Sequence, residues 1–295
     1  MTKIHFYKIY SRLGMVNLPF GETTLNLGVE FGPDAVLSED YLSNFKNQQI
    51  TEYKFSLPED INKEGYYKVI AKESEELTNL ISETLNEDEI QVAIGGDHSI
   101  ALSTILVAAK KYGGENVGVI YFDSHGDLHT VESTPSGNFH GMHMRIISDE
   151  SSNQDLENLT KGYKINPPSI LYIGNQVVED AEIRFMKENN IKNINRKEII
   201  NNPSEVENII INHISKFEHI HISFDIDVLD SSLVTATGIP AKNGLMLEDI
   251  IPLLGIIKSN VESYSVDLVE LNPKKDGAEE TIKIAQTILN NLILN

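Results

Sequence analysis

The chain has no cysteine among its 295 residues. This absence excludes disulfide bonds, thiolate catalysis and cysteine-based zinc or iron–sulfur sites. Any metal ion must therefore be bound by carboxylates and imidazoles, which suit Mn²⁺ better than a metal that prefers soft ligands. Long apolar runs are also missing: residues 250–257 form one of the longest, far short of the roughly 18–20 residues of a membrane span. Because residues 1–20 also lack the apolar core of a signal peptide, we expect a cytoplasmic protein with no membrane partner.

Basic residues are scarce as well. The chain has 24 Lys and Arg against 44 Asp and Glu, a formal net charge of −20. Such a charge repels phosphate backbones, so we expect no nucleic-acid partner. Two bound dications would offset part of the acidic excess, and the rest could attract a cationic substrate. The sequence also lacks Gly-x-Ser-x-Gly, Gly-x-x-x-x-Gly-Lys and Gly-x-Gly-x-x-Gly, the motifs of serine hydrolases, P-loop proteins and dinucleotide-binding folds.

Short β-branched segments alternate with longer segments of helical spacing. The nearly continuous apolar character of most of the short segments is typical of strands buried on both faces of a parallel sheet. This alternation predicts right-handed crossovers and an α/β fold, a three-layer α/β/α sandwich around a mostly parallel, doubly wound sheet. No repeat or linker divides the sequence, so we expect a single domain over residues 1–295. Strands are predicted at 91–94, 117–122, 170–174, 220–224 and 264–269, and helices at 67–85, 100–112, 179–189, 204–214 and 278–294.

Side chains capable of chemistry follow four of the predicted strands. They lie in Gly-Gly-Asp-His-Ser at 95–99, Asp-Ser-His-Gly-Asp at 123–127, Asp-Ile-Asp at 225–227, and at Glu270. Alternate residues of an extended strand point the same way, so the carboxylates and imidazole of 123–127 can converge. Ligands of open α/β sheets bind beyond the carboxyl ends of the strands. The four segments therefore predict a single crevice.

Six of these side chains are the predicted metal ligands. An Asx turn with a helix cap would explain one aspartate in a strand-end segment, but it explains three aligned ligand-type side chains poorly. Four packed carboxylates would repel one another without bound cations. We expect Asp123 and Asp225 to bridge two metal ions, and His98 to lie near a helix start capped by Ser99. Because a two-metal site can ionise water near neutral pH, hydrolysis is the expected reaction class. The predicted ligands are His98, Asp123, His125, Asp127, Asp225 and Asp227.

Two further residues are candidates for catalysis. His140, in the polar loop 136–143, could pass a proton to a leaving amine, although it could equally be an ordinary loop histidine. Glu270 could hold a planar guanidinium through paired hydrogen bonds, or it could be a capped or solvated acid. His213, His219 and His221 lie in or before a predicted strand, and we expect them to be structural.

The four strand-end segments resemble the arginase/agmatinase (ureohydrolase) superfamily, with closest similarity to arginase, and the resemblance spans about residues 28–273. It implies a hydrolase of guanidino or amidino compounds with two Mn²⁺ per chain, usually oligomeric and expected here as a homo-trimer or homo-hexamer. By this resemblance a bridging hydroxide attacks the guanidinium carbon and Asp127 steadies it. Glu270 orients the small cationic substrate, and His140 assists proton transfer. One manganese would be held by His98, Asp123, Asp127 and Asp225, and the other by His125, Asp123, Asp225 and Asp227.

The loop Ser136-Gly137-Asn138-Phe139-His140-Gly141-Met142 is similar to the arginase loop whose serine and asparagine help bind the α-amino and carboxylate groups. The resemblance thus favours cleavage of L-arginine to L-ornithine and urea. Agmatine, other guanidino acids and formiminoglutamate remain alternatives, because three features depart from arginases. These are His129 in place of asparagine, Ile239 in place of threonine, and Asn-Gln-Val-Val-Glu at 175–179. The expected substrate-binding residues are His129, Ser136, Asn138, Glu179 and Glu270.

Two other function classes remain. A two-metal phosphoesterase would need basic residues at the site, and Arg145 and Lys242 are the only nearby candidates. A non-catalytic, metal-binding relative would lack a ligand or Glu270, and none of these is missing from the sequence.

Overall fold

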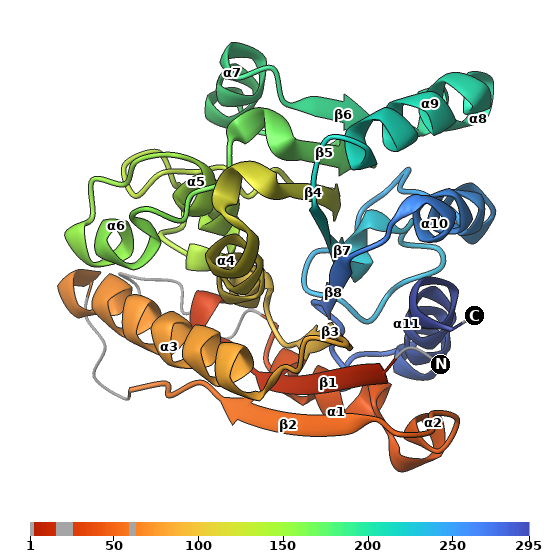
Figure 1. Cartoon of the computed structure of the whole chain (residues 1–295), viewed down its shortest axis with the longest axis horizontal. Helices are drawn as coiled ribbons and strands as arrows, with labels where there is room; N and C mark the ends of the chain where they lie inside the picture. The colour runs from red at the N-terminus through yellow and green to blue at the C-terminus, as the bar shows by residue number, and fades with distance from the viewer. Residues whose placement is uncertain (1–2, 16–25, 59–62, 295) are drawn as a thin grey trace.

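The computed structural model describes residues 3–15, 26–58 and 63–294 (Figure 1). In this part of the chain, eight strands form one sheet in which every strand pairs in parallel with its neighbours. The strands are β1 (Lys3–Tyr10), β2 (Gln49–Lys54), β3 (Glu89–Gly95), β4 (Val117–Phe122), β5 (Ile170–Ile173), β6 (Lys192–Ile194), β7 (His219–Asp225) and β8 (Tyr264–Val269). Their order across the sheet is β2-β1-β3-β8-β7-β4-β5-β6.

Helices cover both faces of the sheet, so the predicted α/β class and three-layer architecture are confirmed (Figure 1). One face carries α3 (Lys63–Thr84), α4 (Ala101–Tyr112), α5 (His143–Ser148), α6 (Gln154–Thr160) and α7 (Asp180–Glu188). The other carries α1 (Gly32–Val36), α2 (Glu39–Leu42), α8 (Arg196–Asn201), α9 (Pro203–Ile214), α10 (Leu247–Asn260) and α11 (Ala278–Ile293). In the described residues, no helix is long and apolar enough to cross a membrane.

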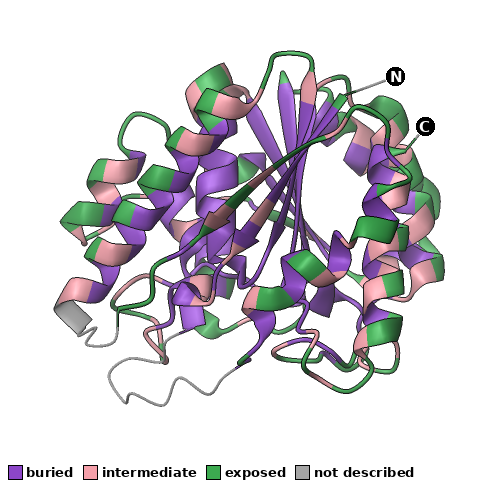
Figure 2. Cartoon of the chain, turned by 90° about the horizontal axis from the view of Figure 1, so that it is seen from below, coloured by how far each residue is buried: buried purple, intermediate pink, exposed green. Residues whose placement is uncertain are grey.

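Alternate residues of the central strands feed two separate hydrophobic cores. In β4, Val119 and Tyr121 pack on the α3–α4 side, while Ile120 and Phe122 pack on the opposite side. All four side chains are fully buried, as expected of a parallel strand covered on both faces. Figure 2 shows the same distribution for the sheet as a whole, with buried strands inside and exposed surfaces on the outer sides of the helices.

The five predicted strands correspond to β3, β4, β5, β7 and β8, and the five predicted helices to α3, α4, α7, α9 and α11. The predicted segments do not include the strands β1, β2 and β6 or the helices α1, α2, α5, α6, α8 and α10. Of these, β2 and β6 are the two edge strands, and β6 has only three residues. α10 carries Pro252 within the helix, a residue that favours a break in a helix-like pattern.

The strand order explains why the four chemical segments meet. β3, β8, β7 and β4 are consecutive neighbours in the sheet, so the loops that follow them leave the same edge side by side. The turn after β3 also approaches β1 closely, since a Cβ on Gly96 would lie 1.8 Å from the carbonyl oxygen of Ser11. Only glycine fits at this position, which places His98 two residues later at the crevice.

Candidate metal centre

The side chains of the six predicted ligands come together at the carboxyl ends of β3, β4 and β7. His98 Nδ1 lies 3.0 Å from Asp123 Oδ2, 3.2 Å from Asp225 Oδ2 and 3.4 Å from Asp127 Oδ2. His125 Nδ1 lies 3.1 Å from an oxygen of Asp227 and 3.5 Å from Asp123 Oδ1. The cluster thus consists of two groups of ligand atoms that share Asp123, each compact enough to surround a metal ion.

In Asp123 and in Asp225, one carboxylate oxygen takes part in a local turn and the other is left to act as a ligand. Asp123 Oδ1 accepts a hydrogen bond from the backbone N–H of His125 at 2.7 Å, and Asp225 Oδ1 accepts one from that of Asp227 at 2.8 Å. These are Asx turns, the local alternative considered for these segments. They leave each Oδ2 atom facing His98. Asp123 Oδ2 is fully buried and receives no aligned hydrogen bond, so a cation would supply its missing partner.

The charges of the cluster are balanced only when positive charge is added. Burial and the neighbouring carboxylates raise the pKa of Asp127 and of Asp225 well above the usual value. Burial alone would lower the pKa of His98, but its contacts with Asp123 and Asp225 raise it well above its usual value. The cluster therefore needs either protons or metal ions. Oxygen and imidazole ligands of this kind suit a hard or borderline dication such as Mn²⁺.

A line of buried polar side chains contacts the Nε2 atom of His98, the ring nitrogen that does not face the aspartates. His98 Nε2 lies 2.9 Å from Ser223 Oγ, which donates a hydrogen bond to Asp267 Oδ1 at 2.6 Å. Because Ser223 donates to the carboxylate, it accepts the Nε2–H of His98 and leaves Nδ1 free to face the aspartates. We call this line, with its continuation along β7 and β8, the polar ladder. Its members are His98, Ser223, Asp267, His221, Ser265 and His219.

The short 3-10 helix that carries His98 (His98–Ile100) has a different cap from the expected one. Its N-cap is Asp97, which accepts a hydrogen bond from the backbone N–H of Ser99 at 2.9 Å. The second oxygen of Asp97 accepts a hydrogen bond from the hydroxyl of Ser11 at 2.8 Å. The expectation that Ser99 is the cap was wrong, because the longer reach of Asp97 serves both the helix and the loop after β1.

Glu270 and His140 lie beside the cluster. Glu270 follows β8 and is buried, and it accepts hydrogen bonds from the backbone N–H of His98 at 3.0 Å and from Asn26 Nδ2 at 2.8 Å. His140 Nδ1 lies 3.6 Å from Glu270 Oε1. Burial would lower the pKa of His140, but the pairing with Glu270 raises it. Glu270 and Asp127 also have positive φ angles of 65° and 51°, a backbone strain that is concentrated at functional sites.

A cavity of about 140 Å³ opens onto the cluster. Its wall includes His129, whose Nε2 lies 3.6 Å from Glu179 Oε2 and 3.8 Å from Glu182 Oε2. Ser136 and Ile239 also line it, together with His125, Asp127, His140 and Glu270 of the site itself. Asn138 is buried in the same loop as Ser136 but is not among the lining residues of this cavity.

Three residues near the site had no strong signal in the sequence. Glu182, in α7, is buried against the 123–127 segment and accepts a hydrogen bond from the backbone N–H of Leu128 at 2.9 Å. The hydroxyl oxygen of Tyr121 lies 2.8 Å from Asp127 Oδ2 and 2.9 Å from His143 Nε2. The available signal was the period of two in β4, which places Tyr121 on the same side as Asp123.

Comparison with known proteins covers almost the whole chain. The sequence model of the arginase family matches residues 11–294. An arginase of Staphylococcus aureus is 30% identical over 91% of this chain and 93% of its own length. The arginase of Bacillus caldovelox has a TM-score of 0.86 at 25% identity and covers 100% of this chain and 99% of its own. The arginase of Entamoeba histolytica, solved in complex with L-ornithine, has a TM-score of 0.85 at 26% identity, with 99% and 98% covered.

The chain belongs to the arginase family.

It is therefore a ureohydrolase, a metal-dependent hydrolase. The family uses a binuclear metal centre, and the two ligand groups that share Asp123 fit such a centre.

Proposed function

We propose that this arginase-family enzyme hydrolyses L-arginine to L-ornithine and urea with two Mn²⁺ per chain. The observation that carries the proposal is the juxtaposition of two ligand groups sharing Asp123 with a cavity that also exposes Glu270 and Ser136. One cation would be held by His98, Asp123, Asp127 and Asp225, and the other by His125, Asp123, Asp225 and Asp227. When bound, the two cations would supply a water-derived nucleophile at neutral pH and help to orient it.

The chain's own residues would position the substrate and move the proton. The side chain of Glu270 is held by the backbone N–H of His98 and by Asn26. A carboxylate fixed in this way can receive paired N–H donors of a guanidinium and keep its plane aligned. Asp127 lies in the same wall and would accept a hydrogen bond from the attacking nucleophile, which fixes its direction.

His140 is suited to donate a proton to the leaving amine. Its pairing with Glu270 favours the protonated imidazole, and its side chain lines the cavity. A general acid needs a proton at the working pH and access to the leaving group. In this scheme, His140 gives its proton to the leaving nitrogen as the C–N bond breaks. The attacking oxygen passes its remaining hydrogen to Asp127 as the C=O bond forms, so that a neutral amine and urea separate.

The distal end of the substrate would contact His129, Ser136 and Glu179, which line the cavity, and only the family resemblance supports the same role for Asn138. Support for an α-amino acid comes from the likeness to the Entamoeba histolytica arginase, whose structure contains L-ornithine. Two observations favour a second candidate, another guanidino or formimino compound. Ile239 presents a half-exposed apolar side chain to the cavity, and His129 stands beside two carboxylates there. The alternatives are thus agmatine, a guanidino acid such as 4-guanidinobutyrate, and formiminoglutamate.

The test is product release from the Mn²⁺-loaded protein with each compound in parallel. Urea is followed for arginine, agmatine and 4-guanidinobutyrate, and formamide for formiminoglutamate. We expect arginine to have the highest kcat/KM. A higher kcat/KM for another compound would make that compound the proposed substrate in place of arginine and would leave the hydrolase mechanism unchanged. Absence of turnover with all four would contradict the proposal and favour a non-catalytic metal-binding relative.

We also propose a cytoplasmic homo-oligomer, a trimer or hexamer, and a single domain over residues 1–295. The oligomer and the location are supported by the resemblance to the superfamily. The single domain is supported by the fact that β1 and β8, from opposite ends of the chain, belong to one sheet. Sedimentation analysis of the purified protein tests the oligomer, and a monomer would contradict it.

A further inference from the structure

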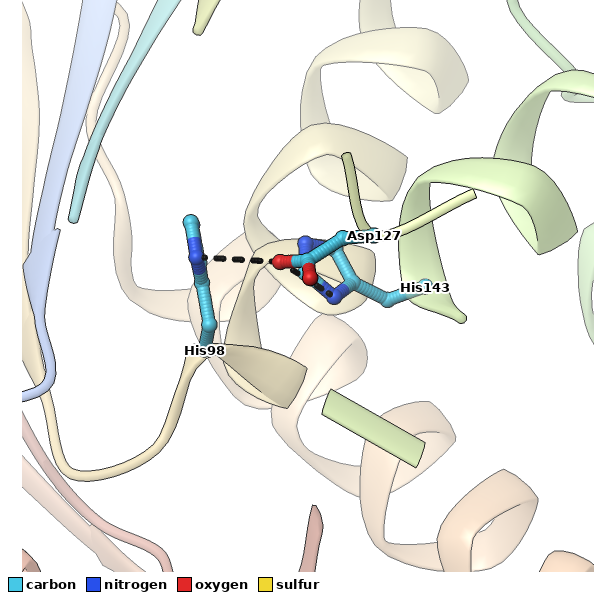
Figure 3. A group of neighbouring side chains, drawn as sticks. All are labelled: His98, Asp127 and His143. Carbon is cyan, nitrogen blue, oxygen red and sulfur yellow. Dashed lines mark ion pairs between the residues drawn. The ribbon is translucent and has the colours of Figure 1, made fainter. Parts of the chain in front are cut away.

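The hydroxyl of Tyr121 lies at the buried end of the metal centre, and the proposed mechanism does not use it. This oxygen is 2.8 Å from Asp127 Oδ2, 3.0 Å from His98 Nδ1 and 2.9 Å from His143 Nε2. Figure 3 shows His98, Asp127 and His143 with their polar atoms turned toward one another. Tyr121 is fully buried and stacks on His98 with ring centroids 4.9 Å apart.

The position of one proton decides what the Tyr121 hydroxyl can do. His143 Nδ1 lies 2.7 Å from the carbonyl oxygen of His140. A carbonyl oxygen can only accept, so Nδ1 carries a hydrogen. A neutral imidazole with hydrogen on Nδ1 has its lone pair on Nε2, the atom that faces Tyr121. His143 is therefore placed to accept the single phenol proton, and its lone pair is not available to a metal ion.

A phenol that donates to His143 turns its lone pairs toward His98 and Asp127. Three electron-rich atoms then face one another, the phenol oxygen, His98 Nδ1 and Asp127 Oδ2, and they need a positive charge between them. The spacing suits a shared cation. Ligand atoms about 2.1 Å from an octahedrally bound cation lie about 3 Å from their neighbours. The phenol oxygen lies 3.0 Å from His98 Nδ1 and 2.8 Å from Asp127 Oδ2. Within the His98 group (His98, Asp123, Asp127 and Asp225), His98 Nδ1 lies at similar distances of 3.0 and 3.2 Å from Asp123 Oδ2 and Asp225 Oδ2.

We infer that the Tyr121 oxygen is an additional ligand of the cation held by His98, with His143 as the acceptor that frees it for this role. The inference rests on the proposed two-cation centre and goes beyond it, because it adds a ligand from the middle of β4 that the strand-end motifs do not include. The competing arrangement has Tyr121 donating its proton to Asp127 Oδ2 and thereby only positioning that carboxylate.

Fe³⁺ distinguishes a bound phenol oxygen from a nearby one. When the oxygen binds Fe³⁺, the phenol proton passes to His143 Nε2, and the resulting phenolate–iron pair absorbs visible light by charge transfer. The variant Tyr121→Phe removes the hydroxyl and keeps the ring that stacks on His98. Tyr172→Phe is the matched control, since Tyr172 is equally buried next to Tyr121 but donates its hydroxyl to the Gly126 carbonyl at 2.6 Å.

With iron content measured in each sample, we expect the visible band in the wild type and in Tyr172→Phe but not in Tyr121→Phe. A wild-type protein that contains iron at the His98 group but lacks the band would overturn the inference. A band that persists in Tyr121→Phe would overturn it as well.

Mn²⁺ binding gives an independent readout and separates this inference from the proposed function. A titration in which free Mn²⁺ is measured by its electron paramagnetic resonance signal should show two binding sites in the wild type. Tyr121→Phe should weaken one of them by at least about 10-fold and leave the other unchanged, while Tyr172→Phe should alter neither. Unchanged affinities in Tyr121→Phe would refute the role of Tyr121 and leave the two-cation centre standing. A wild-type protein that binds no Mn²⁺ would refute both.

Discussion

The far end of the polar ladder yields a pH prediction whose size follows from the structure. His219 is buried in β7, with Nδ1 2.8 Å from Ser263 Oγ and Nε2 2.9 Å from Ser265 Oγ. A neutral imidazole offers one donor and one acceptor, and each serine hydroxyl can match one of them. Burial, with smaller contributions from the neighbouring His221 and Lys111, lowers the pKa of His219 to about 3.

The folded and unfolded states differ in how readily His219 binds a proton. The unfolded chain has a histidine pKa of about 6.5, so between about pH 6.5 and pH 3 the unfolded state binds a proton that the folded state refuses. The stability that comes from neutral His219 is thus complete above about pH 6.5 and is lost as the pH falls. A pH of 5 is about 1.5 units below the pKa of the unfolded histidine. At about 1.4 kcal/mol per unit, the loss is about 2 kcal/mol.

The assay compares the free energy of unfolding at pH 7.5 and pH 5, in urea and at one Mn²⁺ concentration, for the wild type and His219→Gln. The substitution has its own cost in a buried site, but that cost is present at both pH values. The other titrating groups are shared by the two proteins and cancel to a first approximation. We expect the wild type to lose about 2 kcal/mol more than the variant over this range. An equal loss in both proteins would refute the assignment of a neutral, acid-sensitive His219.

Three further predictions concern the metal centre. Asp123→Ala should abolish hydrolysis and lower the bound manganese, because Asp123 faces both His98 and His125; elemental analysis that finds normal manganese would contradict its shared position. His140→Ala should keep the manganese and lower kcat by roughly 10²- to 10⁴-fold through loss of the proton donor, so an unchanged kcat would remove that role. Glu270→Gln should also retain the metal ions but lose most of its kcat/KM for the guanidino substrate, because the amide is uncharged; a rate near that of the wild type would argue against guanidinium binding by Glu270.

The six side chains proposed as ligands could be located from the sequence because their positions depend on local rules. Parallel strands end at one edge of a sheet, and residues two apart on a strand share a side. Asp123, His125 and Asp127 all follow the last residue of β4 within five positions, so they had to lie near its carboxyl end once β4 was recognised. Their Asx turns involve only neighbouring residues and were also foreseeable. Their roles as ligands stay predictions until metal binding is measured.

Features that depend on distant partners could not be read in the same way. β1 has polar residues at Lys3, His5 and Lys8 that interrupt its apolar pattern. His5 is nevertheless buried, because Thr51 of the neighbouring strand β2 lies 2.8 Å from its Nε2. Such a partner becomes visible only when the sheet is assembled, and the same holds for Asn26, which donates to Glu270 across 244 positions of sequence.

Side-chain direction was a further limit. The period of β4 places Tyr121 on the side of Asp123, but it does not reveal that the hydroxyl reaches the atoms of Asp127 and His98. Likewise, Asp97 and Ser99 are both common N-cap residues. The choice between them depends on the loop after β1, where Ser11 and Gly14 donate to Asp97.

The proposed function depends on two cations at the carboxyl ends of β3, β4 and β7 that drive hydrolysis of a guanidino compound. Its most direct test is urea release from arginine by metal-free protein to which Mn²⁺ is added in known equivalents. The proposal predicts activity that rises with added Mn²⁺ and reaches its plateau at two equivalents per chain. Urea release that does not depend on added Mn²⁺, or full activity at one equivalent, would contradict it.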